Sequence, residues 1–165
     1  MVEIALVFQN LISTLTVKIL IDSGASLNLM SQEFVKQLLT TQGPIVKKAL
    51  GTCRENELPT VRVASGQRIR SLGCIDFQLR LSENVISEPV RFFVFKDLPV
   101  QAIVGHRTNS RWKANLSWDT QTWSVTPIGA TEPVSIAWNE TSPQWRAPFK
   151  LLVDGELYHR DHTAK

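Results

Sequence analysis

Cysteine and histidine are scarce in this sequence, whose 165 residues include two cysteines and three histidines. Cys53 and Cys74 do not follow the spacing of a metal site, and one pair does not make a disulfide framework. We therefore expect both to be free thiols in a reducing compartment. His159 and His162 lie close together near the C-terminus, but no supporting second pair accompanies them. The sequence thus predicts no metal site.

Long apolar runs are missing as well. No segment approaches the roughly 20 apolar residues that a membrane-spanning helix needs. The apolar N-terminal stretch is interrupted by Glu3, Gln9 and Lys18 and has no basic leader, so it does not resemble a secretory signal. We expect no membrane partner and a cytoplasmic location.

A strong charge of one sign is the third absence. The formal net charge is +3 and the isoelectric point is about 9.1. Such a small, scattered excess does not predict a nucleic-acid groove. Five tryptophans raise the alternative of a nucleic-acid-binding β-barrel, which needs aromatic and basic residues interleaved on one strand face. Because only Arg111-Trp112-Lys113 and Trp145-Arg146 come near this pattern, we do not expect a nucleic-acid partner.

The remaining composition is ordinary for a soluble globular protein, with 43% apolar and 20% charged residues. In the first two thirds, short runs rich in β-branched and aromatic residues alternate with turn residues, which predicts strands. Residues 31–40 place apolar side chains on one helical face, which predicts a short helix, and residues 42–59 are expected to be looser. The expected strands are 2–8, 15–21, 61–64, 68–70, 72–81, 90–95, 100–104, 116–118 and 123–125, with one or two helical turns in 106–113.

The composition changes after residue 126, since four of the eight prolines fall in the last part of the chain. We expect a folded domain over residues 1–126 and a proline-containing extension over 127–165. Within the extension, Asp154-Gly155 separates two runs of alternating apolar residues. This pattern predicts a β-hairpin over residues 149–159.

Three short elements in a fixed order carry the candidate chemistry. The first is Asp22-Ser23-Gly24, which follows an apolar strand and ends in a glycine that allows close backbone approach. The second is Ala64-Ser65-Gly66, at the tip of a predicted hairpin. The third is Ile103-Val104-Gly105, an apolar strand that ends in glycine before a helix. Each element alone is common, so only their combination indicates a function.

Together these elements resemble the retropepsin family, the aspartic proteases of retroviruses and LTR retrotransposons. Residues 27–35 and 115–125 are also similar to gypsy-type retrotransposon proteases, and the likeness covers roughly residues 3–126. The resemblance implies an all-β fold: a retropepsin-like closed barrel with a flap hairpin and one or two short helices, assembled as a homodimer.

The resemblance also implies a role for each matching residue. Asp22, Ser23 and Gly24 are expected to form the catalytic element, and Val104 and Gly105 to support the active-site loop. No metal or cofactor is implied. The residues expected to bind substrate are Ala25, Ser26, Val63, Ala64, Ser65, Gly66 and Ile103.

Peptide-bond hydrolysis needs a base that activates water and an acid that protonates the leaving nitrogen. Asp-Ser-Gly occurs once, so the second aspartate has to come from another copy of the chain. By resemblance, the two aspartates share one proton and cleave an extended polypeptide, with the chain's own polyprotein as the expected substrate. A virus-like particle in the cytoplasm is the location that this origin suggests.

The sequence departs from the family at one corner. Retroviral members often have aspartate where Ser26 stands and arginine where His106 stands, and these form an ion pair near the dimer interface; here Arg107 lies one position along. Two alternatives remain open. One is a catalytically silent, retroelement-derived dimerisation or scaffold domain. The other is the retropepsin-like domain of a ubiquitin-shuttle protein, which also carries Asp-Ser-Gly-Ala and a Met-Ser pair like Met30-Ser31.

Overall fold

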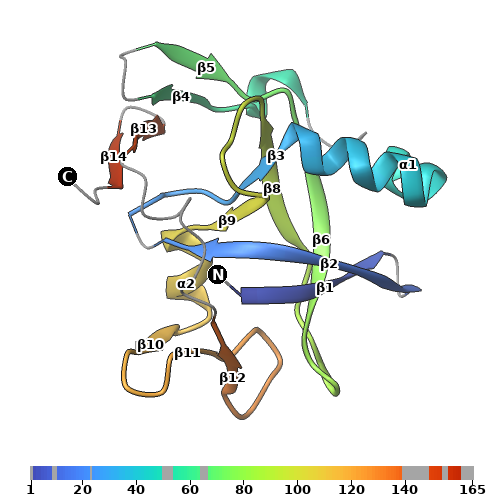
Figure 1. The fold of residues 1–165 in the computed structure, drawn as a ribbon, viewed down its shortest axis with the longest axis vertical. Coiled ribbons are helices and arrows are strands. Elements are labelled where there is room, and N and C mark those ends of the chain that lie inside the picture. Colours follow the sequence, from blue (N-terminus) through green and yellow to red (C-terminus); the bar gives the residue numbers. More distant parts are fainter. Residues whose placement is uncertain are drawn as a thin grey trace.

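The computed structural model describes residues 2–8, 11–22, 24–49, 54–63, 67–138, 149–153 and 156–160. Within these ranges it describes the side chains of 16–22, 24–40, 54, 56–61 and 67–138. Strands predominate over helices (Figure 1). They form one sheet of seven strands, one of four and one of three.

The largest sheet has the strand order β1-β2-β9-β3-β8-β6-β7, and β1 also pairs with β6. This second pairing means that the sheet curls until its first strand meets its sixth. The β2–β9 and β3–β8 pairs are parallel, and the other pairs are antiparallel. The strands are β1 Val2–Phe8, β2 Leu11–Ile21, β3 Leu29–Ser31, β6 Gly73–Ser82, β7 Val85–Ile86, β8 Val90–Phe95 and β9 Ala102–Val104.

Side chains of alternating polarity explain why the long strands form. In β6, Ile75, Phe77 and Leu79 are buried while the residues between them are partly exposed, which is the period of two expected for a strand with one covered face. These side chains join Phe92 of β8 and Ile19 of β2 in the largest apolar cluster. Burying one such side chain contributes about 1.5–3 kcal/mol, so this cluster holds the curled sheet together.

Helix α1 spans Gln32–Ala49 and is much longer than predicted. Its beginning agrees with the sequence, because Ser31 Oγ accepts a hydrogen bond from Glu33 N at 3.1 Å in the manner of an N-cap. The prediction of a short helix followed by a loose segment is wrong, since the helix continues through Pro44. Proline usually ends a helix because it lacks an N–H, at a cost of about 3 kcal/mol. The helix nevertheless continues past Pro44 to Ala49.

Helix α2 (His106–Arg111) follows β9 directly and leads into the three-stranded sheet β10-β11-β12. The strands are β10 Asn115–Ser117, β11 Thr122–Val125 and β12 Val134–Ala137. Trp112 and Trp123 are fully buried with ring centroids 6.1 Å apart, and they join this sheet to the main apolar cluster. Strand β12 lies in the segment treated as an extension, and it pairs with β11 along its whole length.

The four-stranded sheet includes the expected flap hairpin. Strands β4 (Thr60–Val63) and β5 (Arg68–Arg70) pair antiparallel, and the single turn η2 (Glu55–Glu57) precedes them. The predicted tip, residues 64–66, lies outside the described residues. Strand β13 (Phe149–Val153) pairs with β4, and β14 (Glu156–Arg160) pairs with β13. The resulting order is β14-β13-β4-β5, and all four strands lie at the same end of the molecule (Figure 1).

Cys74 lies in β6, is fully buried and is disulfide-bonded. The expectation of a free thiol is therefore wrong for Cys74, while Cys53 lies outside the described residues. Residue spacing did not reveal the bond, because a disulfide depends on two Cα atoms approaching within about 7 Å in the folded chain. The argument for a reducing compartment from free thiols loses its basis.

Among the described residues, no helix is both long and apolar enough to cross a membrane.

Candidate active site

The turn that follows β2 contains Asp22 and positions its carboxylate. Strand β2 ends at Ile21, and Asp22 N then donates a hydrogen bond to Val104 O at 3.0 Å, which holds the aspartate against the end of β9. Ala25 N donates to Asp22 O at 3.2 Å and closes the turn. Gly24 N donates to Asp22 Oδ1 at 3.0 Å, so a backbone group fixes the orientation of the half-buried side chain.

The segment after β9 holds the other side of this turn. His106 N donates to Ala25 O, and Arg107 N donates to Ser26 O at 3.4 Å. The first residues of α2 therefore bind two successive carbonyls of the loop that begins at Asp22. The loop is thus held by main-chain bonds on both sides.

Gly105 is required by the close approach of two backbones. A Cβ at this position would lie 2.5 Å from Leu27 O and 2.6 Å from Ala25 O, distances that real Cβ atoms do not adopt. Because the obstructing atoms are main-chain carbonyls, they cannot move aside as a flexible side chain would. This explains physically why a glycine follows Val104, while its role in supporting an active-site loop stays a prediction.

Asn28 connects the same loop to two further elements. Its Oδ1 accepts a hydrogen bond from Gly105 N at 2.9 Å. Its Nδ2 donates to Thr108 Oγ1 at 2.8 Å and to Arg91 O at 3.2 Å. With 8% of its surface exposed, the side chain makes these bonds away from solvent. Sequence reasoning did not select Asn28.

Asn109 makes a second buried set of bonds beneath the loop. Its Nδ2 donates to Val104 O at 3.2 Å and to Gly105 O at 2.8 Å, and its Oδ1 accepts from Trp123 Nε1 at 2.9 Å. The side chain thereby links the end of β9 to the indole in β11. Like Asn28, it was not predicted as part of the site.

The turn rests on an apolar cluster that also includes the base of the flap hairpin. Leu20 and Ile103 are register partners in β2 and β9, and both belong to a buried cluster with Ala25 and Val61. Val61 lies in β4, so the root of the hairpin and the candidate catalytic turn share one apolar support. Ile103 is 0% exposed, and its predicted contact with substrate stays a prediction.

The structure thus brings together some of the residues predicted from sequence. Asp22, Gly24, Ala25 and Ser26 lie on one loop, and Val104 and Gly105 bind that loop or its flank. Val63 ends strand β4 as part of the hairpin. The predicted residues that lie outside the described ranges are Ser23, Ala64, Ser65 and Gly66.

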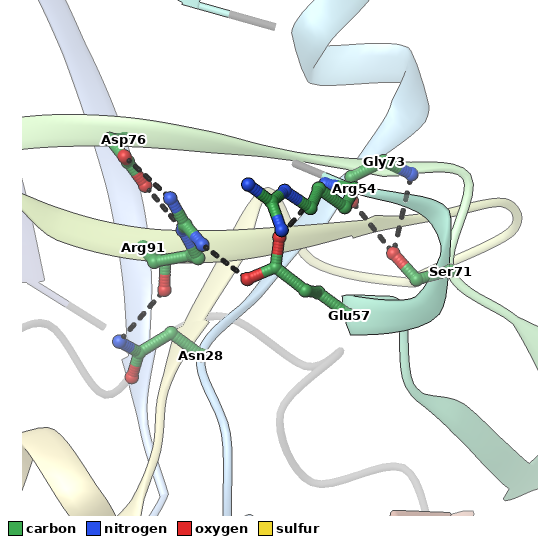
Figure 2. A network of polar contacts seen from close by, with 7 residues as sticks. All are labelled: Asn28, Arg54, Glu57, Ser71, Gly73, Asp76 and Arg91. Carbon is green, nitrogen blue, oxygen red and sulfur yellow. Dashed lines mark hydrogen bonds and ion pairs between the residues drawn. The ribbon is translucent and has the colours of Figure 1, made fainter. Parts of the chain in front are cut away.

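An ionic network joins the segment before the flap to β6 and β8 (Figure 2). Arg91 of β8 makes two bonds to Asp76 of β6, Nε to Oδ1 at 2.9 Å and Nη2 to Oδ2 at 3.1 Å. Its Nη1 lies 3.9 Å from Oε2 of Glu57, whose Oε1 accepts a bond from Arg54 N. The hydrogen bonds to Asp76 raise the pKa of Arg91 against the opposing effect of burial, and the charges of Asp76 and Glu57 add to the rise. Because these groups are partly exposed, each pair contributes at most about 1 kcal/mol, and the network links Glu57 of η2 to β8 and β6.

Comparison with known proteins identifies the fold. No protein-family model and no curated protein sequence matches the chain. Among solved structures, the retroviral protease-like domain of Ddi1 from Leishmania major is similar, with a TM-score of 0.55 and 15% sequence identity. The similarity covers 86% of this chain and 97% of that chain. The fold is retropepsin-like. This confirms the mostly-β, retropepsin-like architecture expected from the sequence, while a place among gypsy-type proteases, catalysis and the homodimer stay predictions.

Asn28 and Asn109 are the site-supporting residues that sequence reasoning missed. Asn28 carries a usable signal, because it interrupts the apolar run 27–30 with a polar amide, and a buried amide needs hydrogen-bond partners. Asn109 has no comparable signal, since it lies in a helix of mixed composition. The partners of Asn28 lie 63 to 80 residues away, and those of Asn109 lie 4 to 14 residues away; both sets become apparent only in the folded chain.

Proposed function

We propose that this chain is an aspartic endopeptidase that acts as a homodimer and cleaves extended polypeptides. The observation that carries the proposal is the Asp22 turn within a retropepsin-like fold. A half-buried carboxylate follows a buried strand, is oriented by Gly24 N, and is held by main-chain bonds from Val104 to Arg107. Such positioning of an acid–base group by rigid elements is what catalysis requires.

The proposed mechanism uses one aspartate from each of two chains. Two carboxylates that lie close together share a proton, because like charges at short distance resist double ionisation. One Asp22 then acts as the base that activates water, and its copy acts as the acid that protonates the leaving nitrogen. The two groups titrate as a pair, so the pH profile belongs to the dyad and not to either residue alone.

The proposed substrate is an unfolded segment bound as an added β-strand between the Asp22 loop and the flap hairpin. Gly24 and Ser26, which are not buried, contact the substrate from the loop, whereas Ala25 is fully buried beneath it; residues 63–66 are proposed to close over the substrate. Val63, at the end of β4, is the residue we propose beside the cleaved bond, which favours apolar substrate residues there, while Ile103 is fully buried and supports the turn from below. The chain's own polyprotein in a cytoplasmic, virus-like particle is the substrate we infer.

The test is cleavage of an unfolded, apolar-rich protein from acidic to neutral pH by the parent chain, Asp22→Asn and Asp119→Asn. Asp119 is exposed in the turn between β10 and β11 and provides a matched control. Loss of acid–base catalysis is expected to lower the rate of Asp22→Asn by about 10²–10⁴-fold, with the control unchanged. Parent activity rises more than linearly with protein concentration and is blocked by a statine-type inhibitor. A parent chain that is folded and dimeric yet inactive at every concentration refutes the proposal.

A second candidate function is suggested by the solved structure that this chain resembles. The same fold occurs as one domain of Ddi1, and this chain lacks the charged residues expected at Ser26 and His106. In this alternative, the chain is a ubiquitin-shuttle-type retropepsin-like domain or a silent dimerisation scaffold. A stable dimer without turnover, whose assembly is unaffected by Asp22→Asn, would favour the scaffold.

A further inference from the structure

Asn28 joins three elements that surround the Asp22 turn: the loop itself, β8 and the segment between β9 and α2. We propose that Asn28 is a positioning residue for the reaction, which sets the geometry of the Asp22 turn by fixing Gly105. This inference rests on the proposed protease function. It adds a residue that acts on the reacting carboxylate through its neighbours and touches neither substrate nor the reacting atoms.

The orientation of the Asn28 amide is determined by its partners. Gly105 N can only donate a hydrogen bond and Arg91 O can only accept one. The amide oxygen therefore faces Gly105 at 2.9 Å and the amide nitrogen faces Arg91 O at 3.2 Å, as Figure 2 shows for the second of these bonds. Thr108 Oγ1, 2.8 Å from the same nitrogen, accepts the other amide hydrogen. Rotating the amide by half a turn would oppose like groups at two of the three contacts.

The backbone of Asn28 is anchored as firmly as its side chain. Phe93 N donates to Asn28 O at 2.9 Å, so β8 holds the residue through the main chain. Strand β8 thus anchors Asn28 next to the active-site loop. Asn28 in turn sets the position of Gly105 through the hydrogen bond between them.

Gly105 lies between the groups that hold the Asp22 turn. Val104 O accepts from Asp22 N, and His106 N donates to Ala25 O. The segment at Gly105 passes so close to the loop that an added Cβ would clash with Leu27 O and Ala25 O. Without the Asn28 bond, Gly105 N loses the acceptor that holds it there, and we expect Gly105 to be displaced from the loop. Such a displacement draws Val104 and His106 from the turn and shifts the carboxylate.

The inference predicts a loss in the chemical step and not in substrate binding. Asn28→Leu removes all three hydrogen bonds and keeps a side chain of similar size. We expect kcat to fall by roughly ten- to a hundredfold, because a misplacement of about 1 Å at a reacting group costs up to about a hundredfold. KM stays close to the parent value, since no group that contacts substrate is changed.

A matched control separates positioning from simple stability. Ser87 is 1% exposed, and its Oγ accepts from Leu79 N at 2.9 Å and donates to Glu88 O at 2.7 Å, away from the Asp22 loop. Ser87→Ala is expected to lower the melting temperature and leave kcat unchanged. Thr108→Val removes one partner of Asn28 and retains the bond to Gly105, so its loss of kcat should be smaller than that of Asn28→Leu.

The experiment measures kcat, KM and thermal unfolding for the parent, Asp22→Asn, Asn28→Leu, Thr108→Val and Ser87→Ala, at a temperature where each is folded and dimeric. An Asn28→Leu chain with the parent kcat overturns the inference and leaves the proposed function intact. The same holds if Ser87→Ala loses as much kcat as Asn28→Leu. If Asn28→Leu does not fold, Asn28→Ala is measured in its place, because it also removes the bond to Gly105 N, and a parent-like kcat in that variant overturns the inference. A parent without Asp22-dependent cleavage refutes the proposed function and this inference together.

Discussion

Replacing Gly105 by alanine tests whether the site depends on the close approach of two backbones. The new Cβ would lie 2.5 Å from Leu27 O and 2.6 Å from Ala25 O, so the segment after β9 has to retreat from the loop. Overpacking of this kind costs typically about 1–3 kcal/mol. The retreat also weakens the bond from His106 N to Ala25 O, and one lost hydrogen bond costs about 0.5–1.5 kcal/mol. We therefore expect Gly105→Ala to lower the free energy of unfolding by about 2–4 kcal/mol.

Urea denaturation of the parent, Gly105→Ala and Gly73→Ala measures this difference. Gly73 in β6 is the matched control, because a Cβ there meets no atom within 4 Å. Alanine at such a position restricts the unfolded chain, so Gly73→Ala should equal the parent or exceed it by up to about 1 kcal/mol. For Gly105→Ala, the urea concentration at the unfolding midpoint should fall, while the slope of the free energy of unfolding against urea stays the same. If Gly105→Ala and the parent have equal free energies of unfolding, the loop and the segment after β9 are not held in close contact.

Two further changes test the support of the site. Asn109→Ala should lower the free energy of unfolding by about 2–4 kcal/mol, because it leaves Trp123 Nε1 buried without an acceptor, and the indole fluorescence should change with it; a parent-like melting curve would contradict this. Asp76→Asn should cost no more than about 1 kcal/mol, since the Arg91 pair is partly exposed. The pKa of Arg91 is raised in the folded chain, so its contribution to stability is complete below the ordinary guanidinium pKa and declines only at strongly alkaline pH. The loss in Asp76→Asn should therefore be the same at pH 6 and pH 9, and a loss that changes between these values would contradict this account of Arg91.

Local patterns in the sequence predicted most strands and the order along the chain of the elements that carry the candidate site. Residues 72–81 alternate in polarity because one face of the strand is covered, and the run that ends at Ile21 is rich in β-branched residues. Each pattern is visible within a single segment of the sequence. The length of α1 was missed because Gly43 and Pro44 are local signals for a helix end, whereas the structure continues the helix beyond them. The disulfide of Cys74 was missed for a related reason, since residue spacing does not report distance in space.

The residues that support the Asp22 loop could not be predicted in the same way. Asn28 binds Gly105 and Thr108 across separations of 77 and 80 residues, and no local pattern encodes such a pairing. The Asp22 turn itself was predictable, because the carboxylate, the glycine and the preceding strand are adjacent in sequence. Sequence motifs thus identified the group proposed to react, and the structure was needed to identify what holds it.

The pairing of β13 with β4 has a consequence for any movement of the flap hairpin. Leu151, Leu152 and Val153 lie opposite Val63, Arg62 and Val61, so β4 is an interior strand and β5 is the edge. Opening of the hairpin by a hinge motion then follows one of two routes. Either β13 and β14 swing with it, and a four-stranded plate moves as one body, or the ladder between β13 and β4 breaks first. In both cases β13 and β14 oppose the opening, and its free energy includes a contribution from residues far along the chain from the hairpin itself.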